Sequence, residues 1–180
     1  MKALFLDRDG VINKDFGYVH DPSNFIFDKD IFELVKKANS LDYIVIVITN
    51  QAGIAKGYYD VAQFKFLTAW MNEKFEQNLC KIDAVYFCPY HPDGIVPEYR
   101  VEHFDRKPKP GMFLKAAKDF AIDMTKSILI GDKISDIEAG LKSRVGTNFL
   151  YIEKRSLNSM SPNYNVITSL TEVTGYLSND

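Results

Sequence analysis

The segment 43–48, Tyr-Ile-Val-Ile-Val-Ile, limits the fold more than any other part of the sequence. It is apolar throughout and β-branched after Tyr43, which is typical of a strand that is buried on both faces. Strands of this kind occur almost only in parallel sheets with helices packed on both sides. The segment therefore predicts an α/β protein with a Rossmann-like parallel sheet.

The rest of the chain alternates between segments with a strand pattern and segments with a helix pattern. Short apolar runs predict strands, and apolar residues at helical spacing predict helices. The expected order is strand 3–6, helix 31–39, strand 43–48, helix 60–78, strand 82–87, helix 110–120, strand 127–130, helix 135–142, strands 148–152 and 165–167, and a short helix at 170–177. Asp60 and Gln63 have the spacing of a capping box. The alternation implies right-handed crossovers, with helices on both faces of the sheet.

Composition narrows the class of protein. The chain has 180 residues, which suits one compact domain over 1–180, and a net charge of -2, which gives no basic field for nucleic acid. No apolar run approaches the roughly 20 residues that span a bilayer, and the two cysteines do not suggest a disulfide framework. We expect a cytoplasmic monomer with no nucleic-acid or membrane partner.

Three polar clusters follow predicted strands. They are Asp7-Arg8-Asp9-Gly10, Thr49-Asn50-Gln51, and Gly131-Asp132-Lys133 with Asp136 close behind. Ligands bind beyond the carboxyl ends of the strands in a parallel sheet, so these clusters are expected to share one crevice. Clustered carboxylates repel one another unless a cation neutralises them, and oxygen ligands favour a hard ion such as Mg²⁺.

The spacing of Asp7 and Asp9 favours phosphoryl transfer. Residues two apart on an extended chain point to the same side, so both carboxylates can reach one substrate. One can attack phosphorus while the other gives a proton to the leaving alcohol. Thr49 and a lysine from elsewhere are suited to hold the phosphoryl oxygens. Without the other clusters, Asp7 and Asp9 would be read equally well as a turn at a strand end.

Together these residues resemble the four motifs of the haloacid dehalogenase superfamily of phosphatases. The matching positions are Leu6-Asp7-Arg8-Asp9-Gly10, Thr49-Asn50, Lys107, and Gly131-Asp132 with Asp136. The resemblance implies a capless member of that fold. Only about 40 residues separate the first two motifs, whereas a second domain usually needs at least about 50. The loop 88–110 and the segment 15–24 are expected to supply specificity instead.

A narrower resemblance rests on longer segments. Residues 7–13, 17–20, 49–55, Cys88-Pro89 and 106–112 resemble the D-glycero-D-manno-heptose 1,7-bisphosphate 7-phosphatase family, which is related to the histidinol-phosphate phosphatases. It implies that Asp7 is the nucleophile, Asp9 the general acid and base, and Thr49 and Lys107 the phosphoryl-stabilising residues. Mg²⁺ would be held by Asp7, the Asp9 carbonyl and Asp132. The implied substrate-binding residues are Arg8, Asp15, Phe16, Gly17, Tyr18, Asn50, Gln51, Ala52, Arg106 and Lys133.

The implied function is removal of the 7-phosphate of the heptose bisphosphate through an aspartyl-phosphate. The resemblance places this step in heptose biosynthesis for lipopolysaccharide or another surface polysaccharide. Two alternatives stay open from the residues: a phosphatase for histidinol phosphate or another small phosphomonoester, and a non-catalytic phosphate-binding relative. Asp136 is expected to orient its neighbours or to support its helix, and His20 is left outside the site.

The sequence departs from the family in the loop 88–110. The resemblance implies a structural zinc site of the form Cys-x-His followed by Cys-x-Cys. Here Cys88 matches the first ligand, but Tyr90 aligns with the histidine, and His103 and Asp105 with the later cysteines. A rearranged zinc site of Cys88, His91, His103 and Asp105 is one alternative, since all four can bind zinc. We prefer a loop without zinc that is held by packing and hydrogen bonds.

Overall fold

The computed structural model describes residues 1–153 and 161–178. Its centre is a six-stranded sheet in the order β3-β2-β1-β4-β5-β6, and every neighbouring pair is parallel. The strands are β1 (Ala3–Leu6), β2 (Ile44–Asn50), β3 (Ala84–Cys88), β4 (Ile128–Gly131), β5 (Thr147–Tyr151) and β6 (Asn165–Ile167). The predicted parallel α/β sheet is thereby confirmed.

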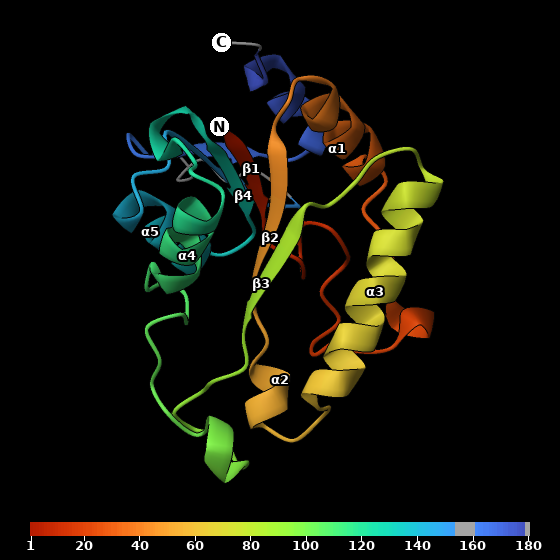
Figure 1. Ribbon diagram of the computed structural model, residues 1–180, viewed down its shortest axis with the longest axis vertical. Helices are drawn as coiled ribbons and strands as arrows, with labels where there is room; N and C mark the ends of the chain where they lie inside the picture. The colour runs from red at the N-terminus through yellow and green to blue at the C-terminus, as the bar shows by residue number, and fades with distance from the viewer. Residues whose placement is uncertain (154–160, 179–180) are drawn as a thin grey trace.

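Helices cover both faces of this sheet (Figure 1). They are α1 (Ile31–Ser40), α2 (Ala52–Ala55), α3 (Val61–Gln77), α4 (Gly111–Asp119) and α5 (Ile134–Lys142), with 3-10 turns η1 (Pro22–Asn24), η2 (Pro97–Tyr99), η3 (Met124–Lys126) and η4 (Leu170–Tyr176). The helices α1 and α3 pack with η4 on one face, and α4 and α5 pack on the other.

The alternation of side chains along the strands divides the core in two. Leu4 and Val45 belong to the cluster under α1 and α3, whereas Phe5 and Ile46 belong to the cluster under α4 and α5. Such strands are buried on both faces, which explains why their sequences are apolar without interruption. None of the helices in the described ranges is long and apolar enough to cross a membrane.

Several local predictions are confirmed, with shifted boundaries. The capping box of α3 forms, because Gln63 N–H donates to Asp60 Oδ1 at 2.8 Å and Asp60 N–H donates to Gln63 Oε1 at 2.9 Å. The strand β2 runs on to Asn50, so Thr49 lies in the strand rather than after it. The short helix α2 was not expected, and the last predicted helix is the 3-10 turn η4.

The register of the strands places the polar clusters side by side. Leu6 of β1 pairs with Val47 of β2 on one side and with Ile130 of β4 on the other. Asp7 therefore emerges beside Ile48 and Gly131, one residue short of Thr49, at the carboxyl edge of the three central strands. The sheet brings together in space three clusters that are far apart in the sequence.

Candidate active site

Asp7 follows β1 directly, and its carboxylate faces a buried lysine. Lys107 Nζ lies 2.9 Å from Asp7 Oδ1 and 2.8 Å from Asp136 Oδ1, and it also donates to the Ile48 carbonyl at 2.7 Å. Asp7, Lys107 and Asp136 are all buried. One ammonium therefore joins a carboxylate from the end of β1 to a carboxylate from the first turn of α5.

Asp132 adds a third carboxylate to this centre. Single oxygens of Asp7, Asp132 and Asp136 all lie within 4.8 Å of one another. Both oxygens of Asp136 have partners, because Oδ2 accepts from the Lys133 backbone N–H at 3.0 Å and Oδ1 faces Lys107. Asp132 Oδ1, in contrast, is buried and has no hydrogen-bond partner within the described ranges.

This arrangement fits a divalent cation. The three carboxylates face one buried ammonium, that of Lys107, and the more exposed Lys133 ammonium lies 3.6 Å from Asp132 Oδ2. Negative charge still exceeds positive charge among the buried groups, and buried charge without a partner is costly. The donors are all oxygens, which suits Mg²⁺, and Mg²⁺ is usually held by one or two carboxylates together with waters and phosphate. Asp7 and Asp132 are the carboxylates that are available to it. The Asp9 carbonyl as a third ligand stays a prediction.

Gly10 shows how tightly this turn is built. Its φ is +94°, a backbone conformation that residues other than glycine rarely adopt. A Cβ atom at this position would lie 2.3 Å from Asp132 Oδ2. The glycine that ends the first polar cluster therefore allows the Asp132 carboxylate to approach the turn after β1.

The electrostatics of the cluster follow from burial and mutual repulsion. Burial raises the pKa of Asp7 well above its usual range, and Asp136 and Asp132 add to that rise while Lys107 opposes it. Burial likewise raises the pKa of Asp132 to about 6, against the attraction of the Lys133 ammonium. Burial would lower the pKa of Lys107, but Asp136 and Asp7 outweigh it and raise that pKa. Lys107 therefore stays charged. A bound cation would stabilise the ionised forms of Asp7 and Asp132.

The carboxylate of Asp9 is held from several sides. Arg8 Nη2 donates to both of its oxygens at 2.9 Å, Asn13 Nδ2 donates at 3.1 Å, and Gln51 Nε2 donates at 3.1 Å. Arg8 is only 1% exposed and also donates to the Val19 carbonyl at 2.6 Å. The Arg8 guanidinium thus fixes the Asp9 carboxylate, and it is itself fixed by the Val19 carbonyl.

A cavity of about 580 Å³ opens in front of these carboxylates. Most of the predicted site residues line it, and they come from β2, from the loop after β1, from the loop before α4 and from the start of α5. The lining residues are Asp7, Asp9, Asp15, Gly17, Tyr18, Thr49, Asn50, Gln51, Ala52, Tyr59, Arg106, Lys107, Pro108, Lys133, Ser135 and Asp136.

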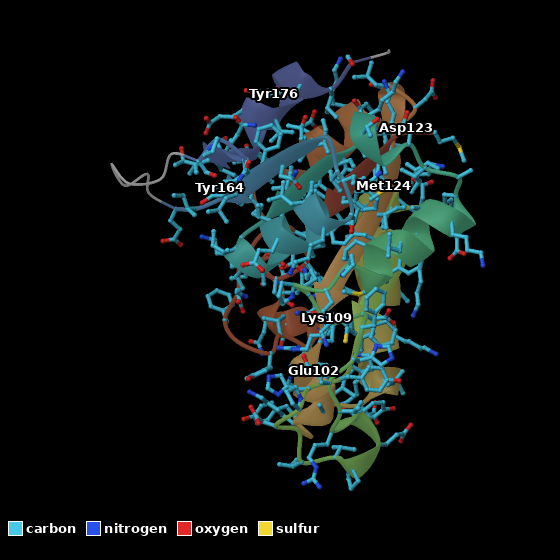
Figure 2. The ribbon with its side chains drawn as sticks, turned by 90° about the vertical axis from the view of Figure 1, so that its left-hand side faces the viewer. Glu102, Lys109, Asp123, Met124, Tyr164 and Tyr176 are labelled. Carbon is cyan, nitrogen blue, oxygen red and sulfur yellow. The ribbon has the colours of Figure 1, made fainter. Side chains whose placement is uncertain are left out.

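Two residues that were expected to bind the substrate lie elsewhere. Arg8 does not line the cavity, because it lies in the turn after β1 and its side chain turns onto Asp9 and the Val19 carbonyl. Phe16 lines a neighbouring cavity of about 410 Å³, together with Asp132 and Tyr151. Lys109 pairs with Glu102 at 2.8 Å, in the loop before α4 (Figure 2), and it does not line the main cavity.

The rim of the cavity carries two further cations, Lys133 and Arg106, and a third cation, Lys56, contacts the rim residue Tyr18 from outside the lining. Lys133 Nζ pairs with Asp15 Oδ2 at 3.0 Å, which ties the loop after β1 to the start of α5. Arg106 Nη1 donates to the Tyr90 carbonyl at 3.4 Å, and Lys56 donates to the Tyr18 hydroxyl at 2.7 Å. The cavity is therefore negative at its floor and positive at its rim.

No motif in the sequence predicted a role for Tyr59, which lines the cavity from the loop before α3. It is 5% exposed, its hydroxyl donates to Gln51 Oε1 at 2.5 Å, and the His20 ring stacks on it with centroids 5.0 Å apart. A Cβ on Gly53 would lie 2.2 Å from this ring. That glycine was the one available signal, but a glycine alone does not indicate which residue approaches it.

The four residues of the rearranged zinc site do not gather into one group, although His103 Nδ1 lies 3.6 Å from Asp105 Oδ2. In the described part of the chain, the one group of three or more histidine, cysteine and acidic residues close enough to share an ion is Asp7, Asp132 and Asp136. His103 stacks on Tyr90 with centroids 4.2 Å apart, and Asp105 pairs with Lys115 of α4. A loop without zinc stays a prediction.

Comparison with known proteins places the chain among phosphatases. The family model described as polynucleotide kinase 3 phosphatase matches residues 5–156. D-glycero-alpha-D-manno-heptose-1,7-bisphosphate 7-phosphatase of Burkholderia mallei is 50% identical over 153 residues, which cover 85% of this chain and 81% of that protein. D-glycero-beta-D-manno-heptose-1,7-bisphosphate 7-phosphatase of Haemophilus influenzae is 42% identical over 149 residues, which cover 83% of this chain and 80% of that protein.

Solved structures agree with this placement. A HAD-like phosphatase from Mesorhizobium loti superposes with a TM-score of 0.89 at 31% identity, covering 98% of this chain and 86% of that one. D,D-heptose 1,7-bisphosphate phosphatase from B. bronchiseptica, complexed with magnesium and phosphate, superposes with a TM-score of 0.85 at 26% identity, covering 98% of both chains.

Proposed function

The chain belongs to the D-glycero-D-manno-heptose-1,7-bisphosphate 7-phosphatase family, and from that premise we propose that it hydrolyses the 7-phosphate of this heptose bisphosphate with the help of Mg²⁺. The observation that carries the proposal is the position of Lys107, whose ammonium lies between Asp7 and Asp136 at the floor of a polar cavity. A buried cation beside a buried carboxylate suits the transfer of an anionic phosphoryl group to that carboxylate.

In the first step, an oxygen of Asp7 attacks the phosphorus of the 7-phosphate. The bond between phosphorus and the sugar oxygen breaks, and Asp9, as the carboxylic acid, gives its proton to that oxygen. Thr49 O–H and the Lys107 ammonium stabilise the phosphoryl oxygens during transfer. Mg²⁺, held by Asp7 and Asp132, supplies positive charge that offsets the repulsion between carboxylate and phosphate.

In the second step, water cleaves the aspartyl-phosphate on Asp7. Asp9, now a carboxylate, takes a proton from the water as its oxygen attacks phosphorus, and the bond between phosphorus and Asp7 breaks. Inorganic phosphate leaves, and both aspartates return to their starting states. The same residue serves as acid and then as base because each step leaves it in the form that the next one needs.

Recognition of the rest of the substrate falls to the rim. Arg106 and Lys133 line the cavity beyond the reacting group, so they are placed to attract a second phosphate. The loop 15–18 and the segment 50–52 are placed to contact the sugar hydroxyls. The Asp15–Lys133 ion pair links the loop proposed to contact the sugar to a lysine proposed to attract the second phosphate.

The loop before α4 is proposed to position Arg106 without zinc. The Tyr90–His103 stack and the Asp105–Lys115 ion pair occupy the places where the family pattern has ligands. Gly111 allows this packing, because a Cβ at that position would lie 2.4 Å from Asp105 Oδ1.

Phosphorus NMR of the reaction tests the proposed function. With Mg²⁺, the 7-phosphate signal of the heptose bisphosphate should disappear while the 1-phosphate signal remains, and this should be measured for both anomers. The Asp7→Asn protein should leave both signals unchanged. Higher kcat/KM for histidinol phosphate would reassign the substrate, and no hydrolysis of any phosphomonoester would contradict the proposal.

A further inference from the structure

The inference concerns Tyr59, which the mechanism above does not use, and it rests on the proposed function. We propose that Tyr59, acting through Gln51, positions both the general acid Asp9 and the phosphoryl-binding Thr49. It does so by fixing the direction in which each hydrogen bond of this network runs. Tyr59 is thus a positioning residue that lies outside the motifs of the sequence.

The network has Gln51 at its centre. Gln51 Nε2 lies 3.1 Å from Asp9 Oδ2 and 2.8 Å from Thr49 Oγ1, and Gln51 Oε1 lies 2.5 Å from the Tyr59 hydroxyl. Gln51 and Thr49 are each 1% exposed. One buried amide therefore contacts two residues to which the mechanism assigns direct roles.

The Asp9 carboxyl and the Tyr59 hydroxyl, at the two ends of the network, determine which groups donate and which accept its hydrogen bonds. In the form in which Asp9 is a carboxylate, it only accepts hydrogen bonds, so the atom of Gln51 that faces it is the amide nitrogen. Gln51 Oε1 then faces Tyr59, and the phenol must donate to it. Burial raises the pKa of Tyr59, which keeps the proton on that oxygen.

Thr49 receives its orientation from the same amide. Gln51 Nε2 is a donor, so Thr49 Oγ1 accepts from it. Thr49 has no second hydrogen-bond partner recorded within residues 1–153 and 161–178, and it lines the cavity. Its own O–H is therefore directed to the phosphoryl oxygens of a bound substrate, which need a donor.

The surroundings hold the phenol in place. The His20 ring stacks on Tyr59 with an interplanar angle of 11°, and Gly53 leaves room for the ring where any side chain would collide with it. Without the phenol, the buried oxygen of Gln51 loses its donor, and the amide is held only through Asp9 and Thr49. A shift of the amide toward a new donor would misplace both Asp9 and Thr49.

The test compares Tyr59→Phe with Tyr86→Phe. The control also loses a hydrogen-bonded hydroxyl, since the Tyr86 hydroxyl donates to Asp119 Oδ2 at 2.6 Å, but Tyr86 does not line the cavity. For Tyr59→Phe we expect kcat on the heptose bisphosphate to fall at least about tenfold, since small misplacements at a reacting centre can cost about 100-fold. KM should stay within about twofold, because the rim is unchanged. The Tyr86→Phe protein should match the wild type.

A second substrate separates positioning from packing. Nitrophenolate leaves without needing a proton, so Tyr59→Phe should lose less activity on nitrophenyl phosphate than on the heptose bisphosphate. Gln51→Glu keeps an acceptor for Tyr59 but removes the donor to Asp9 and Thr49, and it should lose at least as much kcat. This variant carries the test if Tyr59→Phe does not fold, as judged by thermal unfolding.

Two results would overturn the inference while leaving the proposed function intact. One is wild-type kcat in the folded Tyr59→Phe or Gln51→Glu protein, and the other is an equal loss on both substrates of kcat/KM, which reports the first step only. If the wild-type protein hydrolyses neither substrate, the proposed function fails and the inference fails with it.

Discussion

Lys107 Nζ lies 2.9 Å from Asp7 Oδ1, so the carboxylate that we assign as the nucleophile already has a cationic partner before a substrate binds. The same ammonium lies 2.8 Å from Asp136 Oδ1, which fixes the lysine relative to α5. A lysine in this position has two effects. It offsets the repulsion between buried carboxylates, and it leaves a cation beside the place where the phosphoryl oxygens arrive.

Lys107→Met should show both effects. Removing the cation from a buried pair leaves its partner uncompensated, so we expect a loss of about 3 kcal/mol in the free energy of unfolding at pH 8 without metal. The loss should be smaller at pH 5, because the raised pKa of Asp7 favours its protonation there. Urea unfolding at the two pH values measures this, and Lys109→Met serves as the control. An equal loss at both pH values would contradict the account.

Asp132→Asn should change stability in opposite directions with and without metal. The pKa of Asp132 is about 6 in the folded protein and ordinarily 3.8, so ionising it opposes folding above pH 6. The neutral amide removes that cost, and the metal-free protein should gain about 1 to 3 kcal/mol at pH 8. The gain should shrink as the pH falls from 6 to 4.

The same variant should lose its response to magnesium. Wild-type protein is expected to become more stable as Mg²⁺ is added, because a ligand that binds only the folded state stabilises it. Thermal unfolding of both proteins across a magnesium titration measures the difference. A variant that keeps the full magnesium-dependent shift would show that Asp132 is not a ligand.

The sheet was predictable because its signals are local and strong. A β-branched run buried on both faces has few alternatives, and the Asp60–Gln63 capping box is a contact within four residues. Asp7 and Thr49 could be proposed because strand ends and family motifs coincide there, whereas Lys107 was identified from the family motif alone. Boundaries were less predictable. The extension of β2 to Asn50 depends on its pairing with β3, which no short window of sequence contains.

The differences between the expected and the observed lining of the cavity have a physical cause as well. Arg8 stands between two aspartates in the sequence, but it lies in the turn after β1, where its guanidinium binds Asp9 and the Val19 carbonyl instead of lining the cavity. Tyr59 reaches Gln51 through tertiary packing against His20 and Gly53. Contacts of this kind have no spacing in the sequence that would reveal them.

Arg106→Ala should affect recognition more than chemistry. The guanidinium lines the cavity and is directed by the Tyr90 carbonyl, so its loss should raise KM for the heptose bisphosphate about tenfold or more. The kcat on nitrophenyl phosphate, which has no second phosphate, should change by less than about twofold. Arg100→Ala, an exposed change in the same loop, is the control. Equal effects on the two substrates would remove Arg106 from the recognition of the second phosphate.

The loop before α4 should keep its structure without zinc. Elemental analysis of chelator-treated protein should find well below one zinc per chain, and the thermal midpoint should not depend on chelator. Lys115→Ala should lower the free energy of unfolding by up to about 1 kcal/mol, since Asp105 loses its partner, whereas Lys118→Ala on the same helix should not. About one equivalent of tightly held zinc would contradict this.

The central claim is that Asp7 carries the phosphoryl group between the two steps. Acid quenching during turnover of the heptose bisphosphate with Mg²⁺, followed by peptide mass spectrometry, tests it most directly. The account predicts a phosphorylated peptide that contains Asp7, with the group on that residue, and none in Asp7→Asn or without metal. A phosphoryl group found on another residue, or turnover by Asp7→Asn at the wild-type rate, would contradict it.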